Sequence, residues 1–392
     1  MPAVRAIDVD ELWRVAARKV RASANPPKDV YVDGLRCLAS ALESPGRYDE
    51  PALRLLQREL FVRILADLSI SRDVAAHPEI PDIPIRRPLV IAEFGRTGST
   101  LLHNLFALDP HARAPLLWEL WTPSPPSHPD TAAGDPRIEH AQRRLDAFTA
   151  ADPQIRNIHP MEACAPDERH WMMRHSALLP MLYQVPEYWQ WMKQLGHGDL
   201  RELYSHYRLQ IQHLQLWIRR DFWASKSTTH LHFMPVLFEI FPDANIVRLH
   251  RDPCHAVPSL CSLVSGYRRL FAPRVDLAEV GTTLLDMFVD NMKRSMAAPA
   301  SKANQITDIR FEDFVANPIA AVRAIYLRFG YGYCAEFEQA MARYLERERA
   351  AARPRHAYAL EQFGLSPSEV TDRCAVYLKW LETRSRGIAS AP

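Results

Sequence analysis

Apolar side chains in the first part of the chain recur at the spacing of amphipathic helices. Between residues 53 and 65 the apolar positions are Leu53, Leu56, Leu60, Phe61, Ile64 and Leu65. Steps of three and four residues place such side chains on one face of a helix. Asp49 or Glu50 ahead of Pro51 suits a helix start. We therefore expect two or three helices over residues 8–75, followed by a proline-punctuated linker over 76–87.

From residue 88 onward, short apolar runs alternate with longer helical patterns. The runs of strand length are 89–91, 222–226, 244–250 and 306–311, and the helical patterns are 101–106, 204–219, 230–241, 254–265 and 318–329. Strands that alternate with helices indicate a mostly parallel sheet with right-handed crossovers. The pattern thus predicts an α/β fold behind a helical N-terminal leader.

Two segments between the first two strand runs have a biased composition. Residues 122–136 are rich in proline and small polar residues, so we expect no regular structure there. Residues 171–192 hold an aromatic and methionine set: Trp171, Met172, Met173, Met181, Tyr183, Tyr188, Trp189, Trp191 and Met192. Such a set more often forms helix core, and the alternative is an apolar wall for a hydrophobic acceptor.

Composition and charge exclude several classes of protein. The 48 basic and 46 acidic residues nearly balance, which gives no case for a nucleic-acid surface. The six cysteines form no C-x-x-C pair, which is typical of reduced thiols in a cytoplasmic protein. The N-terminus lacks an apolar core of signal-peptide length, and no run of about 18 apolar residues occurs. We therefore expect a cytoplasmic protein without nucleic-acid partners or stable membrane insertion.

The most informative segment is PLVIAEFGRTGSTLLHN at residues 88–104. A strand run ends in a turn with Gly95 and Gly98, and a helical pattern begins directly after it. A helix start of this kind presents free backbone N–H groups and the positive end of the helix dipole, which attract phosphate. The G-x-x-x-x-G-K-[ST] pattern of nucleotide triphosphatases is not met, because the cation is Arg96 and precedes the second glycine.

Three predicted strands end in or beside a cation, namely Arg96, Lys226 and Arg251. In open α/β sheets ligands bind at the carboxyl ends of the strands, so we expect these side chains to meet. Ser259 follows Arg251 by eight residues, just over two helical turns, which allows both to bind one anion. No buried strand ends in a carboxylate placed to hold Mg²⁺; the run 244–250 leads into Arg251. This argues against phosphoryl transfer from ATP.

Together these motifs resemble the sulfotransferases that use 3′-phosphoadenosine 5′-phosphosulfate (PAPS), most of all the bacterial, mycobacterial-type branch. The resemblance implies a P-loop-like, three-layer α/β/α core with a mostly parallel central sheet and a helical C-terminal segment. It also implies that the 5′-phosphosulfate is bound by Gly95, Arg96, Thr97, Gly98, Ser99 and Thr100. Arg251 and Ser259 correspond to the residues that bind the 3′-phosphate, and Lys226 to a lysine near the transferred sulfuryl group.

Further blocks extend the resemblance over nearly the whole chain. They are RAPLLWE at 113–119, QVPEYWQWM at 184–192, FPDANIVRLHRDP at 241–253, RFEDFVANP at 310–318 and HAYALEQFGL at 356–365. We therefore expect one sulfotransferase domain over residues 1–392. Its parts are a helical leader (1–85), a PAPS-binding core (86–330) with an acceptor-pocket insertion at about 120–220, and a helical C-terminal closure (331–392).

The position of the catalytic base departs from one part of this family. Cytosolic eukaryotic members keep a catalytic histidine two residues after the lysine, where this chain has Thr228. Other members use a glutamate beyond the loop, and Glu119 resembles it. We expect Glu119 to be the base, with a pKa raised by the neighbouring Trp118 and Trp121. His230 is the reserve candidate.

The family's adenylate motif is also replaced, and a basic stretch with Arg353 and Arg355 stands in for it. The predicted reaction is in-line transfer of a sulfuryl group from PAPS to a hydroxyl of a hydrophobic small molecule or lipid. Arg96 and Lys226 act as catalytic cations, the 3′,5′-bisphosphate PAP is the product, and no metal is required. The alternatives are a magnesium-dependent P-loop nucleotide kinase or triphosphatase with a degenerate loop, and a non-catalytic nucleotide-binding protein. We leave open whether the chain forms a homo-oligomer.

Overall fold

Five parallel strands form the central sheet in the computed structural model, which describes residues 7–151, 161–167, 171–172, 174–175, 178–272, 274–351 and 358–384. Their bounds are β1 (Leu89–Ala92), β2 (Ala112–Arg113), β3 (Phe222–Ser227), β4 (Asn245–His250) and β5 (Ile306–Arg310). The spatial order is β2–β3–β1–β4–β5, so the chain runs to one side of β1 and then to the other. Ile91 of β1 lies opposite Lys226 and Val247 in its two neighbours. Ligands in α/β sheets bind at such a switch point.

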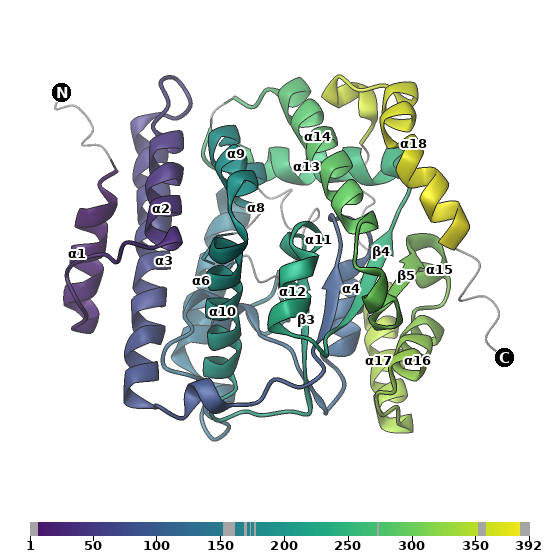
Figure 1. The fold of residues 1–392 in the computed structure, drawn as a ribbon, viewed down its shortest axis with the longest axis horizontal. Coiled ribbons are helices and arrows are strands. Elements are labelled where there is room, and N and C mark those ends of the chain that lie inside the picture. The colour runs from purple at the N-terminus through teal and green to yellow at the C-terminus, as the bar shows by residue number, and fades with distance from the viewer. Residues whose placement is uncertain are drawn as a thin grey trace.

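Helices surround this sheet (Figure 1). They are α1 (Val9–Val20), α2 (Val30–Leu42), α3 (Glu50–Ala76), α4 (Ser99–Phe106), α5 (Leu117–Trp121), α6 (Pro136–Ala151), α8 (Leu178–Leu182), α9 (Pro186–Gln194), α10 (His197–Leu214), α11 (Thr229–His232), α12 (Met234–Ile240), α13 (Pro253–Arg269), α14 (Leu277–Met296), α15 (Phe311–Ala316), α16 (Pro318–Phe329), α17 (Ala335–Ala350) and α18 (Pro367–Arg384). Short 3₁₀ turns are η1 (Ile80–Asp82), η2 (Ala132–Gly134), η4 (Ala300–Gln305) and η5 (Leu360–Phe363).

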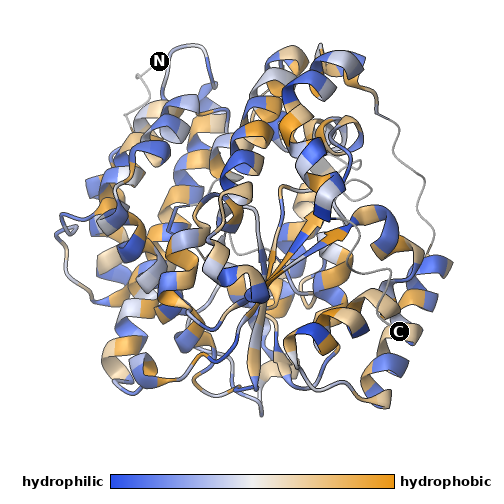
Figure 2. Ribbon diagram, turned by 45° about the vertical axis from the view of Figure 1, so that its right-hand side comes forward, coloured by the Kyte–Doolittle hydropathy of each residue, from blue (hydrophilic) through white to orange (hydrophobic). Residues whose placement is uncertain are grey.

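The two faces of the sheet pack into different apolar clusters. Val90 and Ile246 belong to a cluster with residues of α10 to α14 and α18. Ile91 and Val247, one residue further along each strand, belong to a cluster with residues of α4, α16 and α17. Successive side chains of a strand point to opposite faces, so helices cover both sides. The predicted three-layer α/β/α fold is confirmed, and Figure 2 shows the hydrophobic strands enclosed by helices.

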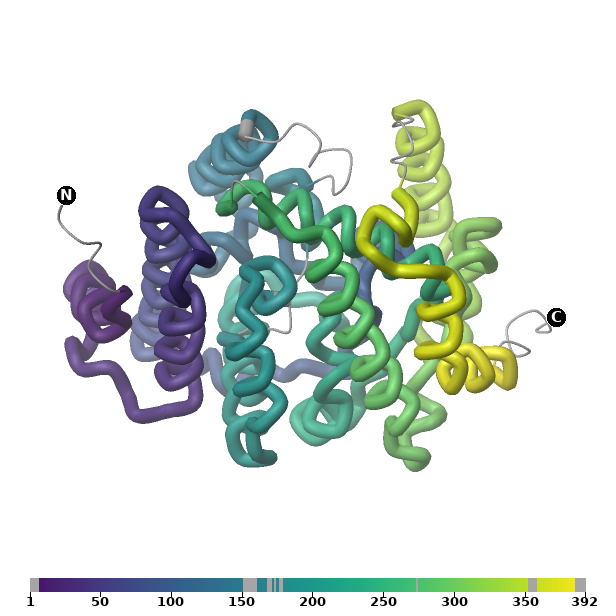
Figure 3. Tube along the Cα trace, turned by 90° about the horizontal axis from the view of Figure 1, so that it is seen from above, coloured from purple at the N-terminus to yellow at the C-terminus, as the bar shows by residue number. Residues whose placement is uncertain are grey.

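The helical leader forms as expected and packs on the rest of the chain. Asp49 accepts a hydrogen bond from the backbone N–H of Ala52 at 2.9 Å, which caps α3 at the start that the sequence indicates. One apolar cluster takes in residues from Ile7 to Leu381. Seen from above, α1 to α3 lie at one side of the molecule and α18 at the other (Figure 3). The division into a single domain with the bounds given above stays a prediction.

The structure differs from the sequence expectations at a few elements. The helix expected over 230–241 is two helices, α11 and α12, which meet at Phe233. Pro235 lacks a backbone N–H and restricts the residue before it, so a continuous helix is disfavoured there. Strand β2 was missed because a two-residue strand has no readable periodicity. The helix expected over 204–219 spans His197–Leu214 instead.

Candidate active site

The loop between β1 and α4 has a left-handed backbone at three of its positions. The φ angles are +113° at Gly95, +61° at Arg96 and +83° at Gly98. Gly98 is the N-cap of α4, and a Cβ atom added to it would lie 3.2–3.3 Å from the rings of Phe311 and Phe314. Glycine is therefore required here for both conformation and space. The turn leaves the first N–H groups of α4 without partners inside the helix, as an anion site needs.

The arginine of this loop meets the serine and arginine of the β4–α13 connection. Arg96 donates from Nε to the hydroxyl of Ser259 at 3.0 Å. Arg251 donates from Nη1 to the backbone carbonyl of Arg96 at 2.9 Å, and its guanidinium lies 4.4 Å from the ring centre of Phe311. Residues from two distant parts of the sequence thus lie together as expected. That they bind the donor's phosphates stays a prediction.

Lys226 reaches the same loop from β3. Phe222 and Ala224 pack in the cluster that contains α4, and Lys226 follows them on the same strand face. Its side chain is buried, and Nζ donates to the hydroxyl of Thr100 at 3.2 Å. The sheet therefore delivers a buried ammonium to the N-terminus of α4. A buried cation beside unpaired helix N–H groups favours a bound anion.

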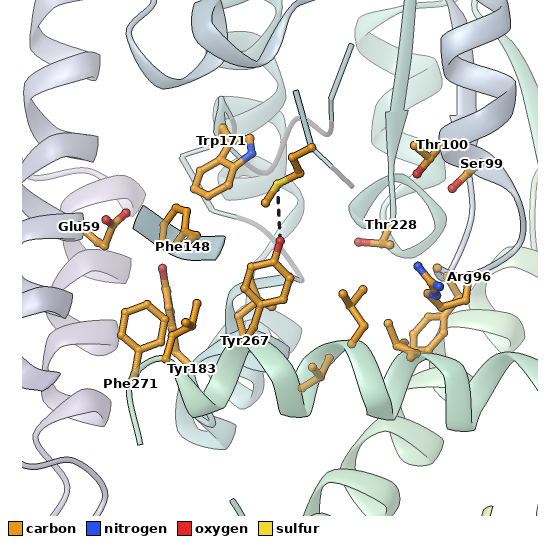
Figure 4. Close-up of a pocket in the computed structure, with 18 of the residues that line it drawn as sticks. Glu59, Arg96, Ser99, Thr100, Phe148, Trp171, Tyr183, Thr228, Tyr267 and Phe271 are labelled. Carbon is orange, nitrogen blue, oxygen red and sulfur yellow. Dashed lines mark hydrogen bonds between the residues drawn. The ribbon is translucent and has the colours of Figure 1, made fainter. Parts of the chain in front are cut away.

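A cavity opens from the loop toward the leader. Its loop end is formed by Glu93, Arg96, Ser99, Thr100 and Thr228, and its opposite end by Glu59, Phe148, Trp171, Tyr183 and Phe271. Figure 4 shows Arg96, Ser99, Thr100 and Thr228 facing the second group, with Tyr267 of α13 between them. Most of the wall is apolar, as in sites that bind small organic molecules. The interpretation of segment 171–192 as helix core holds for Tyr188 and Trp189, whereas Trp171 and Tyr183 line this cavity.

A charged pair lies among the aromatic rings at the far end. Arg144 of α6 donates from Nη2 to both carboxylate oxygens of Glu59 at 2.7 Å. Its guanidinium lies 4.4 Å from the ring centre of Trp121, 5.6 Å from that of Phe148 and 5.9 Å from that of Trp171. Stacking of this kind stabilises a partly buried cation. The cavity therefore ends in a neutralised charge pair rather than in a second anion site.

Glu119 lies outside this cavity wall. Arg113 donates to its two carboxylate oxygens at 2.6 and 3.0 Å, the backbone N–H of Leu116 donates at 2.9 Å, and the hydroxyl of Ser127 donates as well. Burial alone would raise the pKa of Glu119, but Arg113 and the other donors outweigh it and lower that pKa. The expectation of a raised pKa was wrong, because the sequence does not reveal the partner arginine. The catalytic role of Glu119 stays a prediction that this position does not favour.

The remaining predicted site residues are His230, Arg353 and Arg355. His230 is buried, and its Nδ1 atom lies 2.9 Å from the hydroxyl of Tyr204; it does not line the cavity. Arg353 and Arg355 lie outside the described residues. Burial lowers the pKa of the Arg96 guanidinium, and Tyr358, just after these two arginines in sequence, acts in the opposite direction.

The sequence interpretation missed Glu93. This residue directly follows β1, is 1% exposed and lines the cavity, so a carboxylate does follow a buried strand. An acidic residue between an apolar run and a glycine turn is a readable signal, and it was overlooked among the loop cations. Within the described residues, no group of three or more His, Cys, Asp and Glu side chains is arranged to hold a metal ion. No helix in that part of the chain is long and apolar enough to cross a membrane.

Comparisons with known proteins agree with this geometry. The model of the Sulfotransferase family matches residues 88–334, more than half of the chain. The omega-hydroxy-beta-dihydromenaquinone-9 sulfotransferase Stf3 of Mycobacterium tuberculosis is 26% identical over 284 residues, which cover 70% of this chain and 68% of Stf3. Stf3 of Mycobacterium bovis matches with the same values.

Solved structures of mycobacterial proteins share the fold. Sulfotransferase STF1 from Mycobacterium tuberculosis superimposes with a TM-score of 0.82 at 26% identity, over 95% of this chain and 100% of STF1. Sulfotransferase STF9 from Mycobacterium avium gives a TM-score of 0.84 at 22% identity, over 97% of both chains. The agreement extends beyond the sheet, since these matches include nearly all of the leader and the C-terminal segment.

Proposed function

The chain belongs to the sulfotransferase family, and from this premise we propose that it moves a sulfuryl group from PAPS to a hydroxyl group of a lipid-like acceptor. The observation that carries the proposal is the cavity that joins a cationic loop to an apolar wall. A sulfotransferase needs both parts, one for an anionic donor and one for the molecule that receives the sulfuryl group. The sulfuryl group is then transferred where these two parts of the cavity meet.

The donor set suits a molecule with two separate anionic groups. The loop N–H groups, Arg96 and Lys226 form one cluster of donors, which fits a phosphosulfate. Arg251 and Ser259 supply a guanidinium and a hydroxyl beside it, which fits a second phosphate. PAPS carries groups of these two kinds on one adenosine. Its phosphosulfate supplies the activated sulfuryl group, and this chain's cations offset charge on the departing phosphate.

The apolar wall supports a hydrophobic acceptor. Aromatic rings and methionine adapt to irregular apolar molecules, and the wall includes Trp171, Tyr267 and Phe271. The relative Stf3 acts on a hydroxylated menaquinone derivative, as its name states. We extend to this chain the coarser class, a long apolar molecule with a reachable hydroxyl group. An acceptor rich in charge would leave those groups unpaired against the rings.

Titration calorimetry tests the donor. We expect adenosine 3′,5′-bisphosphate to bind without added metal and more tightly than Mg·ATP. Substitution Ser259→Ala should weaken that binding about 10- to 100-fold, because it removes a hydrogen bond to a charged group. The control is Ser368→Ala, whose hydroxyl is exposed on α18 and contacts Ser366. Tight binding of Mg·ATP alone would favour a nucleotide kinase or triphosphatase instead.

Transfer from labelled PAPS to a panel of prenyl alcohols, long-chain alcohols and phenols tests the activity. We expect labelled sulfate esters to form from the apolar alcohols. A protein that binds the bisphosphate but transfers label to none of these acceptors would support a non-catalytic nucleotide-binding role.

A further inference from the structure

Glu93 lies where the donor loop meets the acceptor cavity. It directly follows β1, and it forms part of the cavity wall together with Arg96 and Thr228. The hydroxyl of Thr97 donates to its Oε2 atom at 3.2 Å. The carboxylate is therefore held by the loop that also carries the predicted donor site. An acceptor in this cavity therefore shares its wall with Glu93.

The rest of the cavity wall offers few other groups that accept a proton. Among the described residues of the wall, the second carboxylate is Glu59, which Arg144 binds through both oxygens. Figure 4 shows Glu59 across the cavity from Arg96. Burial raises the pKa of the Tyr183 phenol, so this group holds its proton. No histidine lines the cavity within the described residues.

We propose that Glu93 is the catalytic base of sulfuryl transfer, an inference that rests on the proposed function. The acceptor oxygen forms a bond to sulfur while the bond between sulfur and the bridging phosphate oxygen breaks. The hydroxyl proton passes to a carboxylate oxygen of Glu93, and the electron pair of the broken bond stays on the leaving bisphosphate. The products are a sulfate ester, the bisphosphate and a protonated Glu93, which returns its proton to solvent.

Arg96 makes an anionic base compatible with an anionic donor. Burial lowers the pKa of the Arg96 guanidinium, and the negative charge of Glu93 acts in the opposite direction. Glu93 and Arg96, three positions apart, thus present a carboxylate and a guanidinium to the same cavity. Opposite charges at close range favour the ionised form of both groups. The guanidinium thus offsets the negative charge of a carboxylate base and of a bound phosphosulfate at the same place.

The substitution Glu93→Gln tests the proposal with two acceptors that differ in their need for a base. The side chain keeps its shape, and its amide oxygen can still accept from Thr97. With geranylgeraniol, an alcohol that needs a base, we expect kcat to fall about 100- to 10,000-fold. With p-nitrophenol, which ionises near neutral pH without help, the loss should stay below about tenfold. Calorimetric affinity for adenosine 3′,5′-bisphosphate should match that of the unmodified protein.

Matched controls separate the possible outcomes. Glu346→Gln, an exposed site on α17, should leave both reactions unchanged. Equal losses of kcat with both acceptors, or no loss with either, would overturn the assignment of Glu93. A fall in bisphosphate affinity that accounts for the lost turnover would also overturn the assignment, because Glu93 would then shape the loop and not act as the base. The proposed function is tested separately by whether the unmodified protein transfers sulfate to either acceptor.

Discussion

The two ends of the cavity are built in different ways. The loop end comes largely from one continuous stretch, Glu93 to Thr100, with Thr228 from the end of β3. The opposite end is assembled from residues of α3 and α6 together with Trp171, Tyr183 and Phe271, which are far apart in the sequence. One end is a local motif, and the other exists only after folding.

The forces at the two ends differ as well. At the loop end, positive φ angles at Gly95, Arg96 and Gly98 and directional hydrogen bonds hold fixed charges. Such a site recognises one anion geometry. At the far end, apolar contacts dominate, and these depend on area rather than direction. We infer that donor chemistry and acceptor preference can be changed separately, and the following predictions test that separation.

The largest expected effect lies outside both ends of the cavity. Glu119→Gln should lower the free energy of unfolding by about 3–5 kcal/mol, because it leaves the buried guanidinium of Arg113 without its charge partner. Urea denaturation measures this, and Glu139→Gln, at an exposed pair with Arg143, should change stability by less than about 1 kcal/mol. Folded Glu119→Gln protein should keep its relative activity toward different acceptors. A selective loss with geranylgeraniol but not with p-nitrophenol would move the base to Glu119.

The same pair predicts a dependence on pH. The pKa of Glu119 is lowered in the folded protein, so its contribution to stability is present above the usual glutamate range. That contribution disappears as the pH falls through the lowered value. The difference in stability between the unmodified protein and Glu119→Gln should therefore shrink as the pH falls into the acid range. A constant difference between neutral and acid pH would contradict this account.

At the loop end, Lys226→Met should lower kcat about 100- to 1,000-fold, because it removes a cation from the site where charge develops. The loss should be similar for every acceptor, since we propose that the lysine binds the donor. Lys302→Met is a suitable control, because this lysine donates to the carbonyl of Pro242 away from the cavity. A loss that varies strongly between acceptors would contradict the inference that donor chemistry and acceptor preference can be changed separately.

Gly98→Ala tests the backbone of the loop. The positive φ angle and the nearby rings of Phe311 and Phe314 predict a loss of about 1–3 kcal/mol in stability, together with weaker bisphosphate binding. Gly134→Ala is the matched control, because a Cβ atom there meets no other atom within 4 Å. Thermal denaturation with and without bisphosphate measures both effects. Unchanged binding in Gly98→Ala would show that the loop tolerates a different backbone.

The smallest effect is expected at the far end. Phe148→Ala removes a ring from the apolar wall, so the KM for geranylgeraniol should rise about tenfold. Affinity for the bisphosphate should stay the same. The KM of Phe148→Leu for geranylgeraniol should lie between that of the unmodified protein and that of Phe148→Ala. Steady-state kinetics and calorimetry on the same preparation give both values. A tenfold change in bisphosphate affinity would show that the two ends are coupled.

Local features of the chain made one end of the cavity predictable. The run 89–91, Gly95 and Gly98 specify a strand, a turn and a helix start within a few residues. Arg251 directly follows a readable strand, and Ser259 lies on the helix after it. Propensity, glycine chemistry and periodicity act over such short distances. The parallel sheet and the strand, turn and helix start of residues 89–106 were therefore predictable before any contact between distant residues was known.

Tertiary structure decided the rest. Glu119 and Glu93 are both single acidic residues after apolar positions, and their order along the chain does not show which one binds Arg113. Folding places Arg113 against Glu119 and leaves Glu93 on the cavity wall. It also brings Glu59 and Arg144 together across 85 positions of sequence. Burial and ion pairing depend on which distant segments become neighbours, and no local pattern carries that information.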